Sequence, residues 1–115
     1  MSELSIPYCL DFVSVFGCEC SMDDDYQVQT MQFQDADKNK LQISVSRADH
    51  SVTIILSNEN DVVINHFFFE DLGRFLMDEK NHTLTLEFGS QKPLLITITL
   101  WEKFAIHIRD TSFGR

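Results

Sequence analysis

Cys9, Cys18 and Cys20 are the cysteines of this chain and the first candidates for reactive or metal-binding groups. An odd cysteine count without a secretion signal predicts reduced thiols, which pack as small hydrophobic residues in strands. Cys18 and Cys20 could also supply two ligands to zinc. A structural zinc site usually has a second spaced pair of Cys or His, and the four histidines show no such spacing. We therefore expect no metal and no cofactor.

The histidines are the candidates for acid–base catalysis, which requires two titratable groups held together in a cleft. His50 and His82 fall in predicted turns, and His107 falls on the polar face of a predicted strand. The sequence has no Gly-rich phosphate loop, no Gly-x-Ser-x-Gly elbow and no His-Glu-x-x-His motif. We expect structural histidines and a protein that is not an enzyme. A small hydrolase or metal enzyme built on the histidines is the alternative.

The segment from Asp35 through Asp37 to Asn39 imitates the opening of a calcium loop, with oxygen ligands at its first, third and fifth positions. The sixth position holds Lys40 where the sharp turn requires Gly, and the twelfth holds Ser46 where a bidentate Glu is required. The segment also joins two predicted strands rather than two helices. It is therefore expected to be a hairpin loop.

Asp23, Asp24 and Asp25 form a second acidic group. Consecutive residues of an extended chain point in opposite directions, so three in a row rarely converge on one cation. A solvated turn is one interpretation of this group, and a contact surface for a basic partner is the other.

Alternation of apolar and polar residues predicts the strands that position these groups. It is clearest in the last third of the chain, where three strands form an antiparallel meander with one apolar face and one Thr-rich face. Loops at 89–93 and 101–103 keep every apolar residue on one face, whereas a one-residue slip would invert the faces. The predicted pairs are Phe88 with Leu94, Leu86 with Ile96, Leu84 with Ile98, Leu100 with Phe104, Ile98 with Ile106, and Ile96 with Ile108.

Further strands are predicted upstream of this meander. A turn through 46–51 pairs Val45 with Val52 and Ile43 with Ile54. The other predicted strands cover 10–16, 26–34 and 62–67. Alternation in 26–34 breaks between Val28 and Met31, which indicates a bulge or an edge strand.

One helix is predicted over residues 69–78. Phe68, Leu72, Phe75 and Leu76 have the spacing of one helix face, and two acidic residues lie in its first turn. The run Phe67-Phe68-Phe69 cannot all face one core from a strand, so Phe67 or Phe69 is expected to be partly exposed or to seal the junction of helix and sheet. Trp101 and Tyr26 are expected to be exposed aromatic anchors.

These elements predict a single domain over residues 1–115 of the α+β class that is mostly β. We expect an antiparallel meander of about seven to eight strands, arranged as a sandwich or half-barrel, with one short helix near 69–78. The chain begins Met-Ser-Glu and contains no apolar run of membrane-spanning length, which favours a cytoplasmic protein.

Negative charge is concentrated in the first third of the chain. The first 37 residues contain eight acidic residues and no Lys or Arg, whereas the remainder carries ten acids and nine bases. Nearly all of the formal net charge of −9 therefore comes from this segment. Such an imbalance favours a basic protein partner and argues against binding to nucleic acid or anionic lipid.

The whole chain resembles bacterial toxin-immunity proteins, particularly those of contact-dependent growth inhibition systems, in its small size, acidity, β-rich texture and lack of catalytic motifs. The resemblance implies a protein that neutralises one cognate toxin, commonly a basic nuclease, by occluding its active site.

We expect an acidic surface to occupy the partner's cleft in place of phosphate. The alternative is a non-catalytic subunit or adaptor that binds a protein partner through an apolar strand or the Phe67 region. The predicted partner-binding residues are Glu19, Asp23, Asp24, Asp25, Asp35 and Asp37, with Tyr26 as the aromatic anchor.

Overall fold

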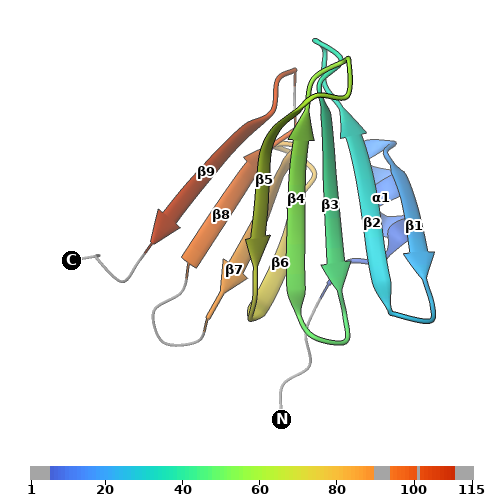
Figure 1. The fold of residues 1–115 in the computed structure, drawn as a ribbon, viewed down its shortest axis with the longest axis vertical. Coiled ribbons are helices and arrows are strands. Elements are labelled where there is room, and N and C mark those ends of the chain that lie inside the picture. The colour runs from blue at the N-terminus through green and yellow to red at the C-terminus, as the bar shows by residue number, and fades with distance from the viewer. Residues whose placement is uncertain (1–5, 90–93, 101, 111–115) are drawn as a thin grey trace.

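A computed structural model describes residues 6–89, 94–100 and 102–110, in which one helix and nine strands are formed. The strands make two antiparallel sheets, one in the order β1-β2-β3-β4-β5 and the other in the order β6-β7-β8-β9 (Figure 1). The elements are α1 (Cys9–Phe16), β1 (Glu19–Asp23), β2 (Val28–Gln34), β3 (Lys40–Ser46), β4 (Ser51–Ser57), β5 (Val63–Phe69), β6 (Leu72–Asp78), β7 (Thr83–Phe88), β8 (Leu94–Thr99) and β9 (Ala105–Asp110).

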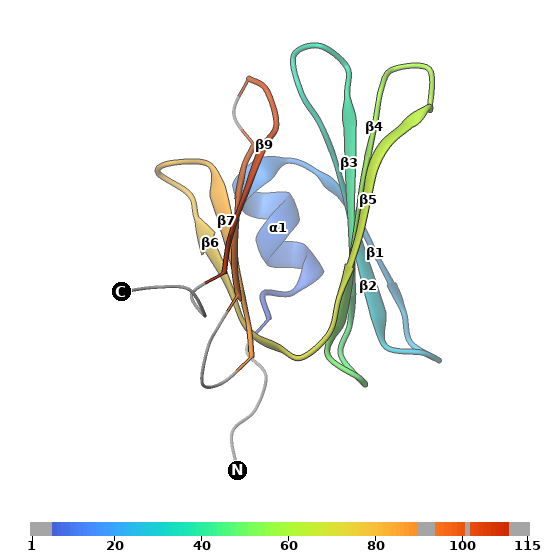
Figure 2. The same cartoon turned by 60° about the vertical axis from the view of Figure 1, so that its left-hand side comes forward.

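The two sheets form the layers of an open sandwich, and α1 lies between them (Figure 2). Phe12 of α1 is fully buried and meets Phe75 of β6 edge to face, with 5.4 Å between the ring centroids. The predicted class, mostly β with antiparallel sheets and one short helix, is confirmed, and the arrangement is a sandwich. In the described part of the chain, no helix has the length and apolar character needed to cross a membrane.

The predicted registers are confirmed in both sheets. Ile96 pairs with Leu86 on one side and with Ile108 on the other, as the loop lengths require. Ile43 pairs with Ile54, and Val45 with Val52. The last pair between β8 and β9 is Thr99 with Ala105, so the predicted pairing of Leu100 with Phe104 is not part of the ladder.

Residues 10–16, predicted to be a strand, belong to helix α1 instead. The Asp11 carboxylate accepts a hydrogen bond of 2.9 Å from the Tyr8 backbone N–H at the start of the helix. Gly17 ends the helix in the left-handed region at φ 66°, and its N–H bonds the Val13 carbonyl. These signals at the two ends of the helix outweigh the strand preference of Val13 and Val15. The helix also lets Phe12 pack against Phe75 of β6 and Phe16 against Phe33 of β2.

Residues 69–78, predicted to be a helix, contain β6 and the connection that leads into it. The register of β6 against β7 shifts between Leu72 and Arg74, at Gly73. This irregularity lets Leu72 and Phe75, three residues apart, both face the core, whereas regular alternation would put them on opposite faces. The spacing of three residues imitated a helix.

The predicted irregularity of strand 26–34 is wrong as well. β2 is an inner strand, paired without interruption to β1 and β3. Its inward positions are Gln29, Met31 and Phe33, all buried. The alternation looked broken because Gln29 is a polar residue at a core position.

Gln29 is buried because Arg47 and the segment before α1 satisfy its amide. The Gln29 Nε2 donates to the Pro7 carbonyl at 2.9 Å, and its Oε1 accepts from the Arg47 Nη2 at 2.9 Å. Arg47 Nη2 also lies 3.2 Å from the Ile6 carbonyl and 3.1 Å from the Pro7 carbonyl. The guanidinium lies over the Tyr8 ring, 4.4 Å from its centroid. This network holds residues 6–8 against the five-stranded sheet.

A disulfide between Cys9 and Cys20 attaches α1 to β1, so the prediction of three reduced thiols is wrong for these two residues. Cys18 is the remaining thiol and is half-buried. Burial raises the pKa of the Cys18 thiol above its usual value.

Replacing Cys9 and Cys20 together by Ser is expected to lower the free energy of unfolding by about 3 kcal/mol, because the bridge closes a loop over a sequence separation of 11 residues. Urea unfolding followed by circular dichroism measures the change. The Cys18→Ser protein, unfolded without reductant, serves as the control and should stay close to the wild type. Equal urea midpoints for the wild type, the Cys18→Ser protein and the double Ser variant, all measured without reductant, would contradict a role of the bridge in stability.

Arg47→Met is expected to destabilise the fold by about 3 kcal/mol, because Gln29 and the two carbonyls lose a charged donor in a part-buried site. Arg74→Met, at an exposed arginine of β6, is the matched control and should change the free energy of unfolding by less than about 0.5 kcal/mol. The prediction fails if the two variants unfold at the same urea concentration.

Candidate interaction surface

The turns of the five-stranded sheet gather at its two ends because successive strands run in opposite directions. The β1–β2 turn, the β3–β4 turn and the β5–β6 connection lie at the lower end in Figure 1. The β2–β3 and β4–β5 turns lie at the upper end. The seven predicted partner-binding residues are divided between these ends rather than brought together in one group.

The lower end carries Asp23, Asp24, Asp25 and Tyr26. All four residues are exposed, and Tyr26 keeps 73% of its surface accessible. The Asp23 Oδ1 accepts hydrogen bonds from the backbone N–H groups of Asp25 at 3.1 Å and of Tyr26 at 3.4 Å, which fixes the turn. The carboxylates of Asp24 and Asp25 are therefore displayed beside an exposed aromatic ring.

Asp49, Glu70 and Asp71 lie at the same end, and the sequence analysis did not select them. All three are exposed, and Asp49 lines one shallow surface depression together with Asp25 and Tyr26. Hydrogen bonds from the Ser51 and Ser46 side chains hold the pKa of Asp49 below its usual value, so this carboxylate stays charged as the pH falls. We call the following six residues the acidic end: Asp23, Asp24, Asp25, Asp49, Glu70 and Asp71.

Positive charge at the acidic end is small. In its three turns, residues 24–27, 47–50 and 70–71, the one Lys or Arg is Arg47. The Arg47 guanidinium is already engaged with the carbonyls of residues 6 and 7 and with Gln29. The carboxylates of the acidic end are thus left to act together on an approaching cation.

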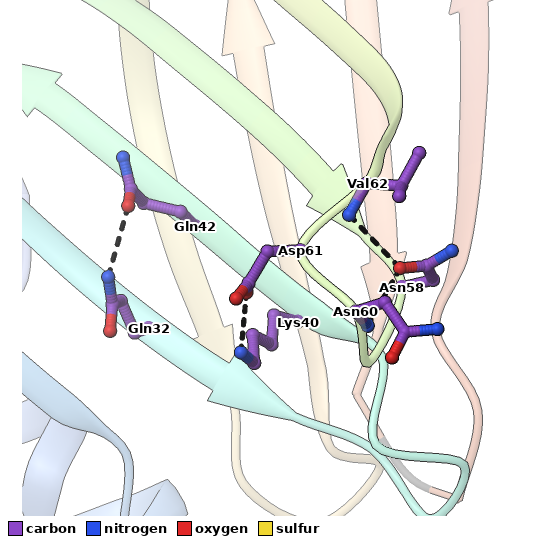
Figure 3. Close-up of polar contacts among 7 residues, drawn as sticks. All are labelled: Gln32, Lys40, Gln42, Asn58, Asn60, Asp61 and Val62. Atoms are coloured by element: carbon purple, nitrogen blue, oxygen red, sulfur yellow. Dashed lines mark hydrogen bonds and ion pairs between the residues drawn. The ribbon is translucent and has the colours of Figure 1, made fainter.

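The upper end mixes both signs of charge. Lys103 Nζ lies 3.6 Å from a carboxylate oxygen of Asp37, and Lys40 Nζ lies 2.6 Å from one of Asp61. Figure 3 shows the second ion pair beside the hydrogen bond between Gln32 and Gln42, and beside Asn58, which accepts from the Val62 backbone N–H. Glu19 is exposed at the start of β1, opposite Gln32. This end is also negative, but less so: Glu19, Asp35, Asp37, Glu59, Asp61 and Glu102 against Lys38, Lys40 and Lys103 give a net charge of −3, compared with −5 for the acidic end counted with Arg47.

Asp35 is buried, with 9% of its surface exposed. Its Oδ1 accepts from the backbone N–H groups of Asp37 at 3.0 Å and Asn39 at 2.9 Å. Its Oδ2 accepts from the Asn39 side chain at 3.2 Å and from the Phe104 N–H at 3.3 Å. The segment 35–39 is the β2–β3 hairpin loop, as predicted, and Asp35 links it to the loop before β9.

The histidines are not gathered in one place. His50 lies in the β3–β4 turn at the lower end, His82 lies in the β6–β7 turn, and His107 is exposed on β9 opposite Thr97. These positions are the predicted ones. Among the described residues, no three His, Cys, Asp or Glu side chains come together as a metal site.

Phe67 and Phe69 are partly exposed, as predicted for one of them, and Phe68 is the most exposed member of the run. Phe67 and Phe69 stack with centroids 6.1 Å apart on the inner face, and Phe69 lies 5.3 Å from Phe88 of the other sheet. The two inner rings join the sheets directly on the side away from α1. The prediction for Trp101 falls outside the described residues.

Comparisons with known proteins give one sequence relative and one structural neighbour. No protein-family model matches the chain. An uncharacterised protein of Pasteurella multocida (strain Pm70) is 29% identical over 110 residues, which span 95% of this chain and all of that protein. One chain of a contact-dependent growth inhibition toxin–immunity protein complex from Klebsiella pneumoniae 342 has a TM-score of 0.77 and 16% sequence identity. The match covers 95% of this chain and 98% of that one. The resemblance indicated by the sequence is confirmed at the level of the fold.

Asp35→Ala is expected to lower the free energy of unfolding by about 3 kcal/mol, because three backbone N–H groups lose their acceptor. Asp37→Ala removes only an exposed ion pair and should change the free energy of unfolding by less than about 0.5 kcal/mol. Urea unfolding of the two variants makes the comparison. A loss of equal size in both would show that the Asp35 bonds do not hold the loop.

Proposed function

We propose that this chain is an immunity protein that binds and neutralises a cognate toxin. The observation that carries the proposal is the acidic end, six exposed carboxylates on two turns of the five-stranded sheet and on the connection from β5 to β6. The fold shared with a chain of a toxin–immunity complex supports it. A rigid sandwich that displays carboxylates at one end is a suitable inhibitor of a protein with a cationic active site.

The partner that fits this surface is a basic nuclease toxin. Nucleases bind polyanions through basic clefts, and the acidic end would occupy such a cleft in place of phosphate groups. Clustered charge of one sign accelerates encounter with a cationic partner, by electrostatic steering that weakens as the salt concentration rises. Tyr26 would then serve as an aromatic anchor beside Asp24 and Asp25.

The residues at the upper end have a smaller part in this proposal. About 13 Å separates Glu19 from Asp23 along β1, so one partner domain could reach both. Asp37 would contact the partner through the hairpin loop, and Asp35 would act by fixing that loop. We place the protein in the bacterial cytoplasm, where an inhibitor of a nuclease is needed and where the thiol pool favours the reduced form of the Cys9–Cys20 pair, and assign it no catalysis.

Reversing Asp23, Asp24 and Asp25 to Lys should slow association with the cognate toxin domain, for which the product of the preceding gene is the first candidate to test, by about ten-fold or more. Stopped-flow mixing at low salt measures the association rate, and rescue of growth in cells producing the toxin measures neutralisation.

The matched control reverses Glu59, Glu79 and Glu102, three exposed turn residues elsewhere in the fold, and so changes the net charge equally. It should associate several-fold faster than the first variant. Equal rates for the two triple variants would remove the Asp23–Asp25 turn from the interface. A wild-type protein that neither binds nor protects would defeat the proposed function.

An adaptor that binds a protein partner through an apolar surface is the second candidate. It is favoured by the exposed apolar residues of β5 and the preceding turn, which include Val63, Ile64 and Phe68. An adaptor of this kind would tolerate the triple reversal at Asp23–Asp25, because its binding would not depend on charge.

A further inference from the structure

β5 differs from the other strands at the edges of the two sheets. The edges are β1, β5, β6 and β9. β1 contains Glu19 and Asp23, β6 contains Arg74 and Asp78, and β9 contains Arg109. Charged residues on an edge strand discourage pairing with another chain. β5 has seven residues, none of them charged, and so lacks this protection.

Apolar side chains make up most of the exposed surface at β5, with exposed Asn65 and His66 among them. Val62, Val63, Ile64 and Phe68 each expose more than half of their surface. Together they expose apolar surface on the order of 400 Å², which is within the range of the largest apolar patch on a typical monomer, a patch that is often functional. Figure 1 shows β5 at the margin of its sheet, where its outer main-chain groups have no neighbouring strand of that sheet.

We propose that the free edge of β5 binds an extended segment of a partner as a sixth strand of the sheet. The segment is apolar where it passes Val63, Ile64 and Phe68, and carries basic residues at the end that meets Glu70 and Asp71. Pairing of main chains supplies hydrogen bonds, and the exposed side chains supply specificity. This inference rests on the proposed function in one respect, that the partner strand belongs to the cognate toxin.

Charge complementarity selects this occupant over a second copy of the chain. Two β5 strands paired antiparallel about their midpoint, His66, would place Asp71 of each copy beside Asp61 of the other, whose charge Lys40 offsets only in part at this exposed site. Each copy also carries a net charge of −9. Like charges directly opposite each other destabilise strand pairing, whereas Lys or Arg at the same positions stabilises it.

The β5 edge is continuous with the acidic end, because Glu70 and Asp71 directly follow Phe69. A basic partner attracted to the acidic end therefore arrives next to an open strand edge. The two surfaces have different tasks: the carboxylates raise the association rate, and the strand pairing lengthens the lifetime of the complex.

Ile64→Lys and Phe68→Lys, made separately, test the proposal with the cognate toxin domain. Each should raise the dissociation rate by about ten-fold while changing the association rate by less than about three-fold. Leu76→Lys is the matched control, since Leu76 is an exposed apolar residue of edge strand β6. Circular dichroism of all three variants verifies folding. Wild-type dissociation rates for both β5 variants would overturn the proposal.

Hydrogen exchange tests the strand edge independently of the toxin. The probe is a synthetic peptide of alternating Val and Thr with two Lys at one end, and the control peptide has Glu in place of Lys. The Lys peptide should protect the β5 amides at lower concentration than the Glu peptide does. Failure of the toxin to bind, with protection by the peptide, would reject the proposed function and support the strand site.

The exchange experiment can also reject the strand site. Absence of β5 protection with both the toxin and the peptide would overturn the inference even if a toxin complex forms. Analytical sedimentation of the wild-type protein alone tests whether a second copy of the chain occupies the edge. A dimer in the wild type that is lost in Ile64→Lys would assign the edge to a second copy and overturn the proposal.

Discussion

The Arg47 guanidinium and the main-chain carbonyls it binds anchor the segment that leads into the helix between the two sheets. Its bonds to residues 6 and 7 and to Gln29 hold the start of α1 against the five-stranded sheet. The helix then occupies the space between the layers, with Phe12 against Phe75 of β6. On the opposite side the sheets meet directly through Phe69 and Phe88. The sandwich is therefore held apart by a helix on one side and closed by aromatic rings on the other.

This arrangement also separates two kinds of surface. The antiparallel order of strands sends the turns of the first sheet alternately to its two ends. Salt bridges of Lys40 and Lys103 offset part of the negative charge of the upper end, whereas the single arginine in the turns of the lower end is occupied within the fold. The difference in charge between the two ends thus depends on where Lys and Arg side chains form contacts, as well as on where the acidic residues occur in the sequence. One end is left with a concentrated negative field.

The sequence predicted those parts of the fold that depend on local periodicity. The registers around Ile43 and Ile96 followed from loop lengths, because only one register keeps all apolar residues on one face. The helix and β6 were misassigned because the deciding features are not periodic. The Asp11 carboxylate begins an eight-residue helix and Gly17 ends it. An irregularity at Gly73 gives the buried residues of β6 the three-residue spacing of a helix face. The Cys9–Cys20 bridge joins a helix to a strand, so no spacing rule could reveal it.

The site was predictable in part for the same reason. Asp23 to Tyr26 stood out because they are consecutive, whereas Asp49, Glu70 and Asp71 join them only through the topology. Assigning each predicted turn to an alternate end of the sheet would have brought Asp49 to Asp23–Asp25, whereas Glu70 and Asp71 were predicted to lie in a helix. Asp35 was predicted as surface charge, although the Asp-x-Asp-x-Asn pattern is also that of a carboxylate that bonds its own loop.

The half-buried Cys18 has a consequence for the covalent integrity of the molecule. It lies two residues from Cys20, within the same segment as the bridge to Cys9. A thiol attacks a disulfide only as its thiolate, and burial raises the pKa of Cys18, so little of the reactive anion exists near neutral pH. The fold thereby slows scrambling to mispaired isomers and preserves one connectivity in a chain with three cysteines, a protection that lapses under alkaline conditions.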